Sequence, residues 1–169
     1  MSHVQGEFVY DRFLPSRTMR SGTNPATPSG RACHMLFNNS TGAFALLVWN
    51  ILAYPNGSNP VGAAFTQTSA GTNSGVTIEP FISGGQIGPG QHLYGDGAFT
   101  AINPSLMLGA VTGQTAWMVD KPVMALLPGW GCAVQVLTSG VALRLSFIWS
   151  YIDAAELYAY DIPGVEGHV

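Results

Sequence analysis

The stretch KPVMALLPGWGCAVQVLTSGVALRLSFIWSY, residues Lys121–Tyr151, is typical of three consecutive β-strands joined by two turns. The first turn falls at Pro128-Gly129, because proline presets φ and glycine accepts a positive φ. The second is Thr138-Ser139-Gly140, a short hairpin loop that contains glycine. We therefore expect strands over Val123–Leu127, Cys132–Leu137 and Ala142–Tyr151.

The third of these strands alternates large apolar side chains with small or polar ones. An antiparallel strand that is buried on one face shows this period of two. The large side chains are therefore expected to fill a core: Leu143, Leu145, Phe147, Trp149 and Tyr151. No catalytic motif lies in the stretch, which indicates a scaffold.

Turn clusters divide the rest of the chain into more short strands, about eight in all. We expect them at Arg31–Phe37, Ala43–Tyr54, Val61–Thr68, Val76–Ile82 and Phe99–Ile102, and Trp117–Val119 leads back into the three-strand unit. Ala43–Tyr54 suits a short helix equally on hydrophobicity, but its β-branched and aromatic residues favour a strand that is buried on both faces. The pattern predicts an all-β fold, an antiparallel β-sandwich resembling a jelly roll.

The two ends of the chain differ from the strand-rich region described above. Residues 1–30 read as an extended arm with apolar anchors, although a simple N-terminal strand of the same domain is an equal alternative. Residues 31–151 form the sandwich, and residues 152–169 form an acidic tail in which Asp153–Leu157 has the composition of one helical turn.

Charged residues make up only 9% of the 169 residues, against about 25% in an ordinary soluble domain. So sparsely charged a surface favours association with other molecules. The net charge of −3 argues against nucleic-acid binding. The longest apolar run spans about 12 residues, against roughly 20 for a bilayer, and no signal peptide precedes it, so we expect no membrane partner and synthesis in a cytoplasm.

The sequence offers little reactive chemistry. The four histidines lack metal-ligand spacing: His3, His34, His92 and His168. Cys33 and His34 are strand neighbours on opposite faces, so they serve neither as chelators nor as a nucleophile–base pair. We expect Cys33 and Cys132 to be buried thiols, with a disulfide only if their strands are adjacent.

Two acids, Glu79 and Asp96, flank the glycine-rich middle, but nothing defines the separation that glycoside hydrolysis requires. No nucleophile elbow or phosphate-binding loop occurs. We therefore expect no enzyme, no catalytic residue, no metal and no cofactor. Of the tryptophans, Trp149 belongs to the core, while Trp130 is expected to be displayed in its turn as an inter-subunit anchor or a glycan platform.

Two segments resemble small virion proteins of tailed bacteriophages. FNNSTGAFALLVWNI, Phe37–Ile51, is similar to their asparagine- and glycine-led hydrophobic strand, and Lys121–Tyr151 resembles their closing unit, with its aromatic-x-Trp ending at Phe147-Ile148-Trp149. The resemblance covers about half the chain. The glycine-rich middle and the acidic tail depart from that pattern.

This resemblance implies a non-enzymatic, homo-oligomeric protein of the virion. The leading interpretation is a head decoration (cement) protein, a trimer or dimer that binds the major capsid protein on the capsid surface and is made in the host bacterial cytoplasm. The alternative is a tail-fibre or spike module that recognises a host glycan. We expect the arm to contact the shell through Phe8, Tyr10, Arg12, Phe13, Arg17 and Arg20, and self-association to use Trp49 and Trp130.

Overall fold

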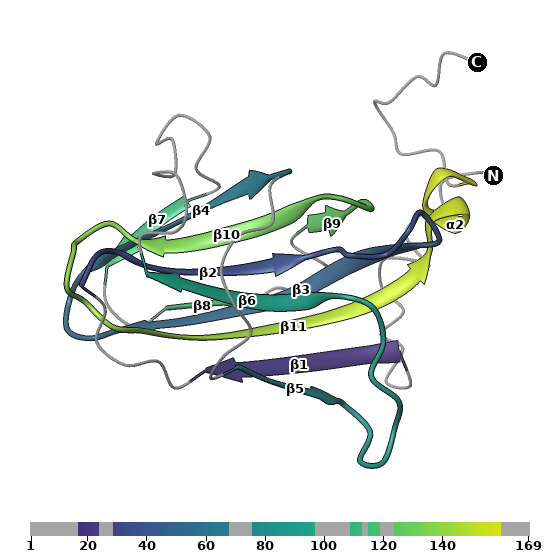
Figure 1. Ribbon diagram of the computed structural model, residues 1–169, viewed down its shortest axis with the longest axis horizontal. Coiled ribbons are helices and arrows are strands. Elements are labelled where there is room, and N and C mark those ends of the chain that lie inside the picture. The colour runs from purple at the N-terminus through teal and green to yellow at the C-terminus, as the bar shows by residue number, and fades with distance from the viewer. Residues whose placement is uncertain are drawn as a thin grey trace.

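In a computed structural model, the protein consists of two antiparallel β-sheets packed face to face (Figure 1). The structure describes residues 17–23, 29–67, 76–96, 109–112, 115–118 and 124–159. Within these ranges there are eleven strands and one short helix. None of the helices described has the length and hydropathy needed to cross a membrane.

The first sheet, named here the β11 sheet, is built around the antiparallel pairing of β11 with β3, the longest pairing among the described strands. Its order is β5 (Val76–Pro80), β1 (Thr18–Thr23), β11 (Leu143–Asp153), β3 (Phe44–Pro55) and β8 (Thr115–Met118), and β9 (Met124–Leu126) also pairs with β3. The second sheet, the β10 sheet, has the order β6 (Gln91–Asp96), β2 (Ala32–Phe37), β10 (Gly131–Val136), β4 (Pro60–Thr66) and β7 (Gly109–Thr112).

The order of the strands is that of a jelly roll. Setting aside β5, β6 and β9, the chain alternates between the sheets from β1 to β4, remains in the β10 sheet for β7, and alternates again through β8, β10 and β11. The first and last strands, β1 and β11, are therefore neighbours, as two interlocked Greek keys require. The inserted strands β5 and β6 extend both sheets, beside β1 and β2. The predicted all-β, jelly-roll-like sandwich is confirmed.

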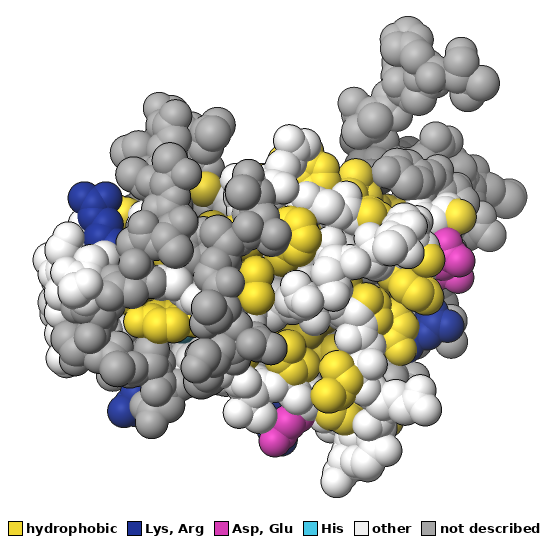
Figure 2. Space-filling view, viewed as in Figure 1, with side chains coloured by type: hydrophobic (Ala, Val, Ile, Leu, Met, Phe, Trp, Pro, Cys, Tyr) yellow, Lys and Arg dark blue, Asp and Glu magenta, His cyan; other side chains and the backbone are white. Residues whose placement is uncertain are grey.

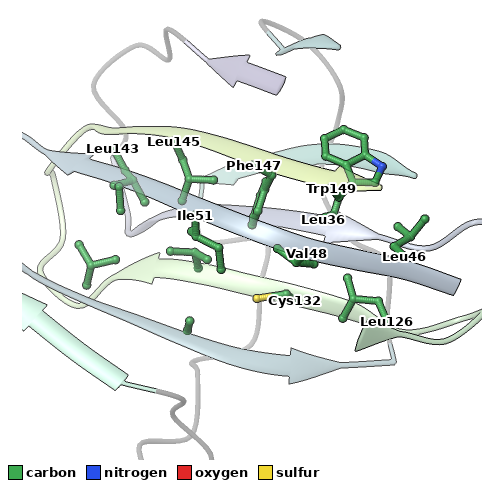
Figure 3. Packing of buried hydrophobic residues seen from close by; sticks show 14 of the residues in the cluster. Leu36, Leu46, Val48, Ile51, Leu126, Cys132, Leu143, Leu145, Phe147 and Trp149 are labelled. Atoms are coloured by element: carbon green, nitrogen blue, oxygen red, sulfur yellow. The ribbon is translucent and has the colours of Figure 1, made fainter. Parts of the chain in front are cut away.

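The core lies between the sheets, and β11 contributes its large side chains as predicted. Leu143, Leu145, Phe147 and Trp149 are buried and face Leu36 and Cys132 of the opposite sheet (Figure 3). The fifth residue of the alternation, Tyr151, is only partly buried and packs against this cluster. Each fully buried side chain of this size contributes about 1.5–3 kcal/mol, so this strand is a principal source of stability.

A β-bulge explains why β3 is apolar on both faces. Ile148 pairs with Asn50 but Trp149 pairs with Val48, so Trp49 is an extra residue in β3. The bulge moves the core-facing positions from even to odd numbers, and Val48 and Ile51 both point into the core (Figure 3). On the outer face of the β11 sheet, α2 (Ala154–Ala159) covers the part of β3 that runs up to the bulge. The side chains buried there form a second cluster: Ala45, Leu47, Trp49, Ile152 and Leu157.

Three strands differ from the sequence-based expectations, and one of them is β7, which pairs with β4 where no strand is expected. Thr18–Thr23 lies within the residues assigned to the arm, but it forms β1 between β11 and β5, so the alternative of an N-terminal strand holds for these six residues. Gln91–Asp96, in the glycine-rich middle, forms the regular edge strand β6. The strand expected at Phe99–Ile102 and residues 1–16 of the arm lie outside the described residues.

Candidate functional site

One end of the sandwich carries nearly all of the exposed large hydrophobic side chains in the described part of the chain. We name it the apolar end, and it comprises Phe65, Phe81, Ile82, Ile87 and Trp130. Tyr54, at the far end of β3, is the exception. Figure 2 shows hydrophobic side chains on the right-hand side of the molecule, with an acidic and a basic side chain at the edge, where Figure 1 places the β5–β6 loop and the end of β11.

Strand pairing and hydrogen bonds bring these residues to the same end. Gly131 pairs with Thr66 and Cys132 with Phe65, so the preceding Trp130 lies at the end of the β10 sheet where β4 ends. The backbone N–H of Asn38 donates to the carbonyl of Trp130 at 2.9 Å. The next residue, Asn39, accepts a hydrogen bond from the N–H of Gly90, at the base of the β5–β6 loop, at 3.1 Å.

The base of the β5–β6 loop (residues 81–90) is held tightly against the core. The indole N–H of Trp149 donates to the carbonyl of Pro89 at 3.0 Å. Gly90 has a positive φ of 111°, and a Cβ there would lie 2.7 Å from the indole nitrogen of Trp149, so the residue suits this close approach. Because the base is anchored, the uncharged tip presents Ile87, which is 65% exposed, in a defined position.

The turn that displays Trp130 is also rigid. The N–H of Gly129 donates to the carbonyl of Asn38 at 3.0 Å, and that of Trp130 to the carbonyl of Leu127 at 3.0 Å. The buried amide of Asn38 donates to the carbonyls of Phe44 and Leu126. The Trp130 side chain remains 38% exposed on this turn, as the sequence predicted for a displayed residue.

The residues predicted to contact a capsid shell are only partly within the described chain. Phe8, Tyr10, Arg12 and Phe13 lie outside it. The Arg17 guanidinium lies 5.9 Å from the centroid of the Tyr151 ring. Arg20 forms an exposed ion pair with Glu79 at 2.8 Å, a contact of a kind that contributes about 0–1 kcal/mol. The shell-contact role of these residues stays a prediction.

Of the two residues predicted for self-association, only Trp130 presents substantial surface. Trp49 is 8% exposed, packs beneath α2 and donates its indole N–H to the hydroxyl of Ser150 at 2.8 Å. Its ring is therefore used within its own chain. Self-association itself stays a prediction, with Trp130 as the residue through which a second copy has access.

A pair of buried histidines is the feature that the sequence reasoning missed. His34 of β2 and His92 of β6 are 58 residues apart, yet Nδ1 of His34 lies 3.1 Å from Nε2 of His92. The register pairs Leu36 with His92, so the two imidazoles are diagonal neighbours on the core face of the β10 sheet. No spacing in the sequence predicts this contact, because it depends on the pairing of β2 with β6.

Each imidazole makes a second hydrogen bond to the opposite sheet. Nε2 of His34 lies 2.9 Å from the carbonyl oxygen of Leu143, and Nδ1 of His92 lies 2.7 Å from Oγ of Ser21. Burial lowers the pKa of His34 to about 4, although its hydrogen bond to Leu143 opposes the shift. Burial, and secondarily His34, lowers the pKa of His92 well below its usual range, so both rings are neutral at pH 7.

The two cysteines are free thiols, as predicted. Their strands, β2 and β10, are adjacent, but Cys33 packs on the outer face of the sheet and Cys132 in the core. Burial raises the pKa of Cys132 to about 12 and raises that of Cys33 still further, so neither forms a thiolate readily. Cys33 and His34 lie on opposite faces, as predicted. No group of three or more potential metal ligands occurs among the side chains that the structure describes.

Comparison with known proteins does not assign a family. No protein-family model matches the chain, and no curated protein matches it. A solved structure titled "CBM4 structure and function" aligns with 12% identity over 82% of this chain and 96% of that chain, with a TM-score of 0.21. A score this low does not show a shared fold. The class defined by the strand order, a jelly-roll β-sandwich with an inserted β5–β6 pair, rests on the structure of the chain itself.

Proposed function

We propose that this chain is a non-enzymatic structural protein of a bacteriophage virion, a decoration (cement) protein that binds the assembled head shell as a homo-oligomer. The observation that carries the proposal is the apolar end, where five large hydrophobic side chains are exposed on a rigid framework. Such a surface is costly in water, and it favours burial against another protein.

The physical properties of the apolar end suit a protein interface. Trp130 is an aromatic anchor on a turn held by backbone hydrogen bonds, and such anchors dominate binding energies. The anchored base of the β5–β6 loop reduces the ordering cost of bringing Ile87 into contact. Only 9% of the residues are charged, so few ions need to be desolvated when two copies meet.

The virion assignment draws on two further supports. Jelly-roll sandwiches recur in viral capsid and lectin domains. The segments Phe37–Ile51 and Lys121–Tyr151 resemble phage virion proteins. A protein that binds only the assembled shell stabilises that shell by mass action, which is the physical basis of cementing.

The first experiment measures self-association by light scattering across a concentration series. Trp130→Ala and Ile87→Ser are compared with Tyr54→Ser, a matched control that removes an exposed side chain at the opposite end. We expect the wild type and Tyr54→Ser to form the same oligomer and the two apolar-end variants to shift toward monomer. A wild type that stays monomeric at every concentration would overturn the oligomeric part of the proposal.

The second experiment tests attachment to the shell. Purified shells of the virus that encodes the chain are incubated with the full chain or with a chain lacking residues 1–16, a truncation that spares β1. Decoration by the full chain alone supports the arm as the anchor. Full occupancy by the truncated chain excludes the arm, and absence of the protein from intact virions excludes the virion assignment.

A second candidate function is recognition of a host glycan by a tail-fibre or spike module. The observation in its favour is the exposed Trp130 ring, because a displayed aromatic face can stack on a sugar. A glycan array separates the two functions. A saccharide hit that Trp130→Ala abolishes and Tyr54→Ser retains would favour recognition over decoration.

A further inference from the structure

We propose that His34, His92 and Ser21 form an acid-sensitive latch that joins the two sheets at neutral pH and releases them when the histidine pair becomes doubly protonated. The latch is a chain of three hydrogen bonds between a carbonyl, two imidazoles and a hydroxyl. Two of the three cross from one sheet to the other, from β2 to β11 and from β6 to β1. This inference does not depend on the proposed function.

In the neutral state every hydrogen in the latch has a defined direction. The Leu143 carbonyl only accepts, so Nε2 of His34 carries a hydrogen and donates to it. Nδ1 of neutral His34 must then accept, so Nε2 of His92 donates to it. Nδ1 of His92 accepts in turn from the hydroxyl of Ser21. Both rings are therefore Nε2–H tautomers, and no imidazole nitrogen lacks a partner.

A first proton can enter without separating the groups. It binds to Nδ1 of His92, which then donates to Oγ of Ser21 after the hydroxyl hydrogen rotates away. The hydrogen between the two rings can lie on either His34 or His92, so the pair holds one charge along an intact inter-ring hydrogen bond. The geometry of the strands is unchanged in this state.

A second proton cannot be accommodated. Both facing nitrogens, 3.1 Å apart, would then carry hydrogens, and two positive charges would face each other in the core. The inter-ring hydrogen bond is lost and the charged rings must reach water. Because the same rings hold the cross-sheet bonds to β11 and β1, their departure separates the sheets at this point.

The surroundings provide no charge that would neutralise the pair. Tyr94 of β6 lies beside His34, with ring centroids 4.9 Å apart, and the Cys132 thiol of β10 occupies the same core. The uncharged ring of Phe147 packs edge-on against His92. No described carboxylate faces the latch. The charged side chains of β1, β5 and β11 are exposed: Arg20, Glu79, Arg144 and Asp153.

The test measures urea unfolding of the full chain from pH 7.5 to pH 4. In the unfolded chain both histidines titrate near 6.5, while the folded latch stays neutral, so the unfolding equilibrium constant should rise by up to about 100-fold for each unit below pH 6.5. One of the two histidines should account for about 10-fold per unit. The combined His3→Gln and His168→Gln variant is the matched control, and it should retain the wild-type slope.

The variants His34→Gln and His92→Gln keep a donor and an acceptor on the side chain and do not titrate. Each single variant should halve the slope, and the double variant should remove it. A double variant that retains the wild-type slope would overturn the proposal. If a variant does not fold, ¹⁵N NMR of the wild-type imidazoles decides: Nε2–H signals of neutral rings at pH 6 support the latch, and ordinary titration of both rings near 6.5 refutes it.

Discussion

Gly90 is the position where a single methyl group should reveal how the β5–β6 loop is held. Gly90 has φ of 111°, and a Cβ there would lie 2.7 Å from Nε1 of Trp149 and 3.1 Å from Cδ1 of Leu46. The Gly90→Ala substitution therefore combines backbone strain with a collision against the core. The collision involves the indole that anchors the loop through its hydrogen bond to Pro89.

The loss of unfolding free energy expected for Gly90→Ala is the sum of three contributions. A non-glycine residue at positive φ costs about 1–2 kcal/mol. Overpacking against a buried ring costs about 1–3 kcal/mol, and weakening the hydrogen bond from Trp149 adds about 0.5–1.5 kcal/mol. We therefore expect Gly90→Ala to reduce the free energy of unfolding by about 3–6 kcal/mol.

Gly84 provides the matched control for this substitution. Its φ of 79° is also positive, but no atom lies within 4 Å of the position of a Cβ. Gly84→Ala should therefore show only the backbone strain, about 1–2 kcal/mol. Gly88→Ala tests a steric collision without backbone strain, because Gly88 has no positive φ and its Cβ would overlap the ring of Tyr151.

The assay is urea unfolding, together with thermal melts and the NMR signal of the Trp149 indole N–H. The unfolding free energy of Gly90→Ala should fall below that of Gly84→Ala by about 2–4 kcal/mol, which corresponds to a melting temperature roughly 5–15 °C lower. The indole signal should shift in Gly90→Ala only. Equal destabilisation by the two variants would refute the reasoning, because it would show that the contact with Trp149 contributes nothing.

Three further predictions concern the buried polar and thiol groups. Ser21→Ala should reduce the unfolding free energy at pH 7.5 by about 1–3 kcal/mol, because it leaves Nδ1 of His92 buried without a donor; an unchanged urea midpoint would contradict this. The free energy of unfolding should be highest above pH 6.5 and fall toward pH 4, because the folded pKa of His34, about 4, lies below its unfolded value. This histidine alone should lower the free energy of unfolding by about 3 kcal/mol over that range, and its proton uptake on unfolding can be measured. Cys33 and Cys132 should react with a thiol reagent at pH 8 only after unfolding, and rapid modification of the native chain would show that either thiol is accessible.

The strands with strong patterns could be predicted from the sequence. The period of two in β11 places its large side chains in the core, and turn residues such as Gly129 and Gly140, with φ of 78° and 73°, occur where the chain reverses. These signals are local, since alternation and turn chemistry act over a few residues. The strand β1 has no such signal. Its one large apolar residue is Met19, and the next position on the same face is Ser21, a polar residue that hydrogen-bonds His92.

The two tryptophans considered for self-association show what a sequence pattern can predict and what it cannot. Trp130 follows a turn, and the turn displays it as predicted. Trp49 is one residue of an apolar run, and its position depends on the bulge opposite Ile148 and Trp149 and on α2 returning across the sheet. A bulge shifts every following side chain to the other face, so the destination of Trp49 cannot be obtained from alternation alone.

The sequence by itself determined the all-β class, most of the strands, the sparse charge and the core face of β11, because these depend on composition and on neighbours along the chain. Only the tertiary structure decided which strands are neighbours in each sheet, the gathering of Phe65, Ile87 and Trp130 at one end, and the contact between His34 and His92. Those features arise from pairing between strands that are far apart in the chain. Such pairing is selected by the packing of the whole core, which no local segment encodes.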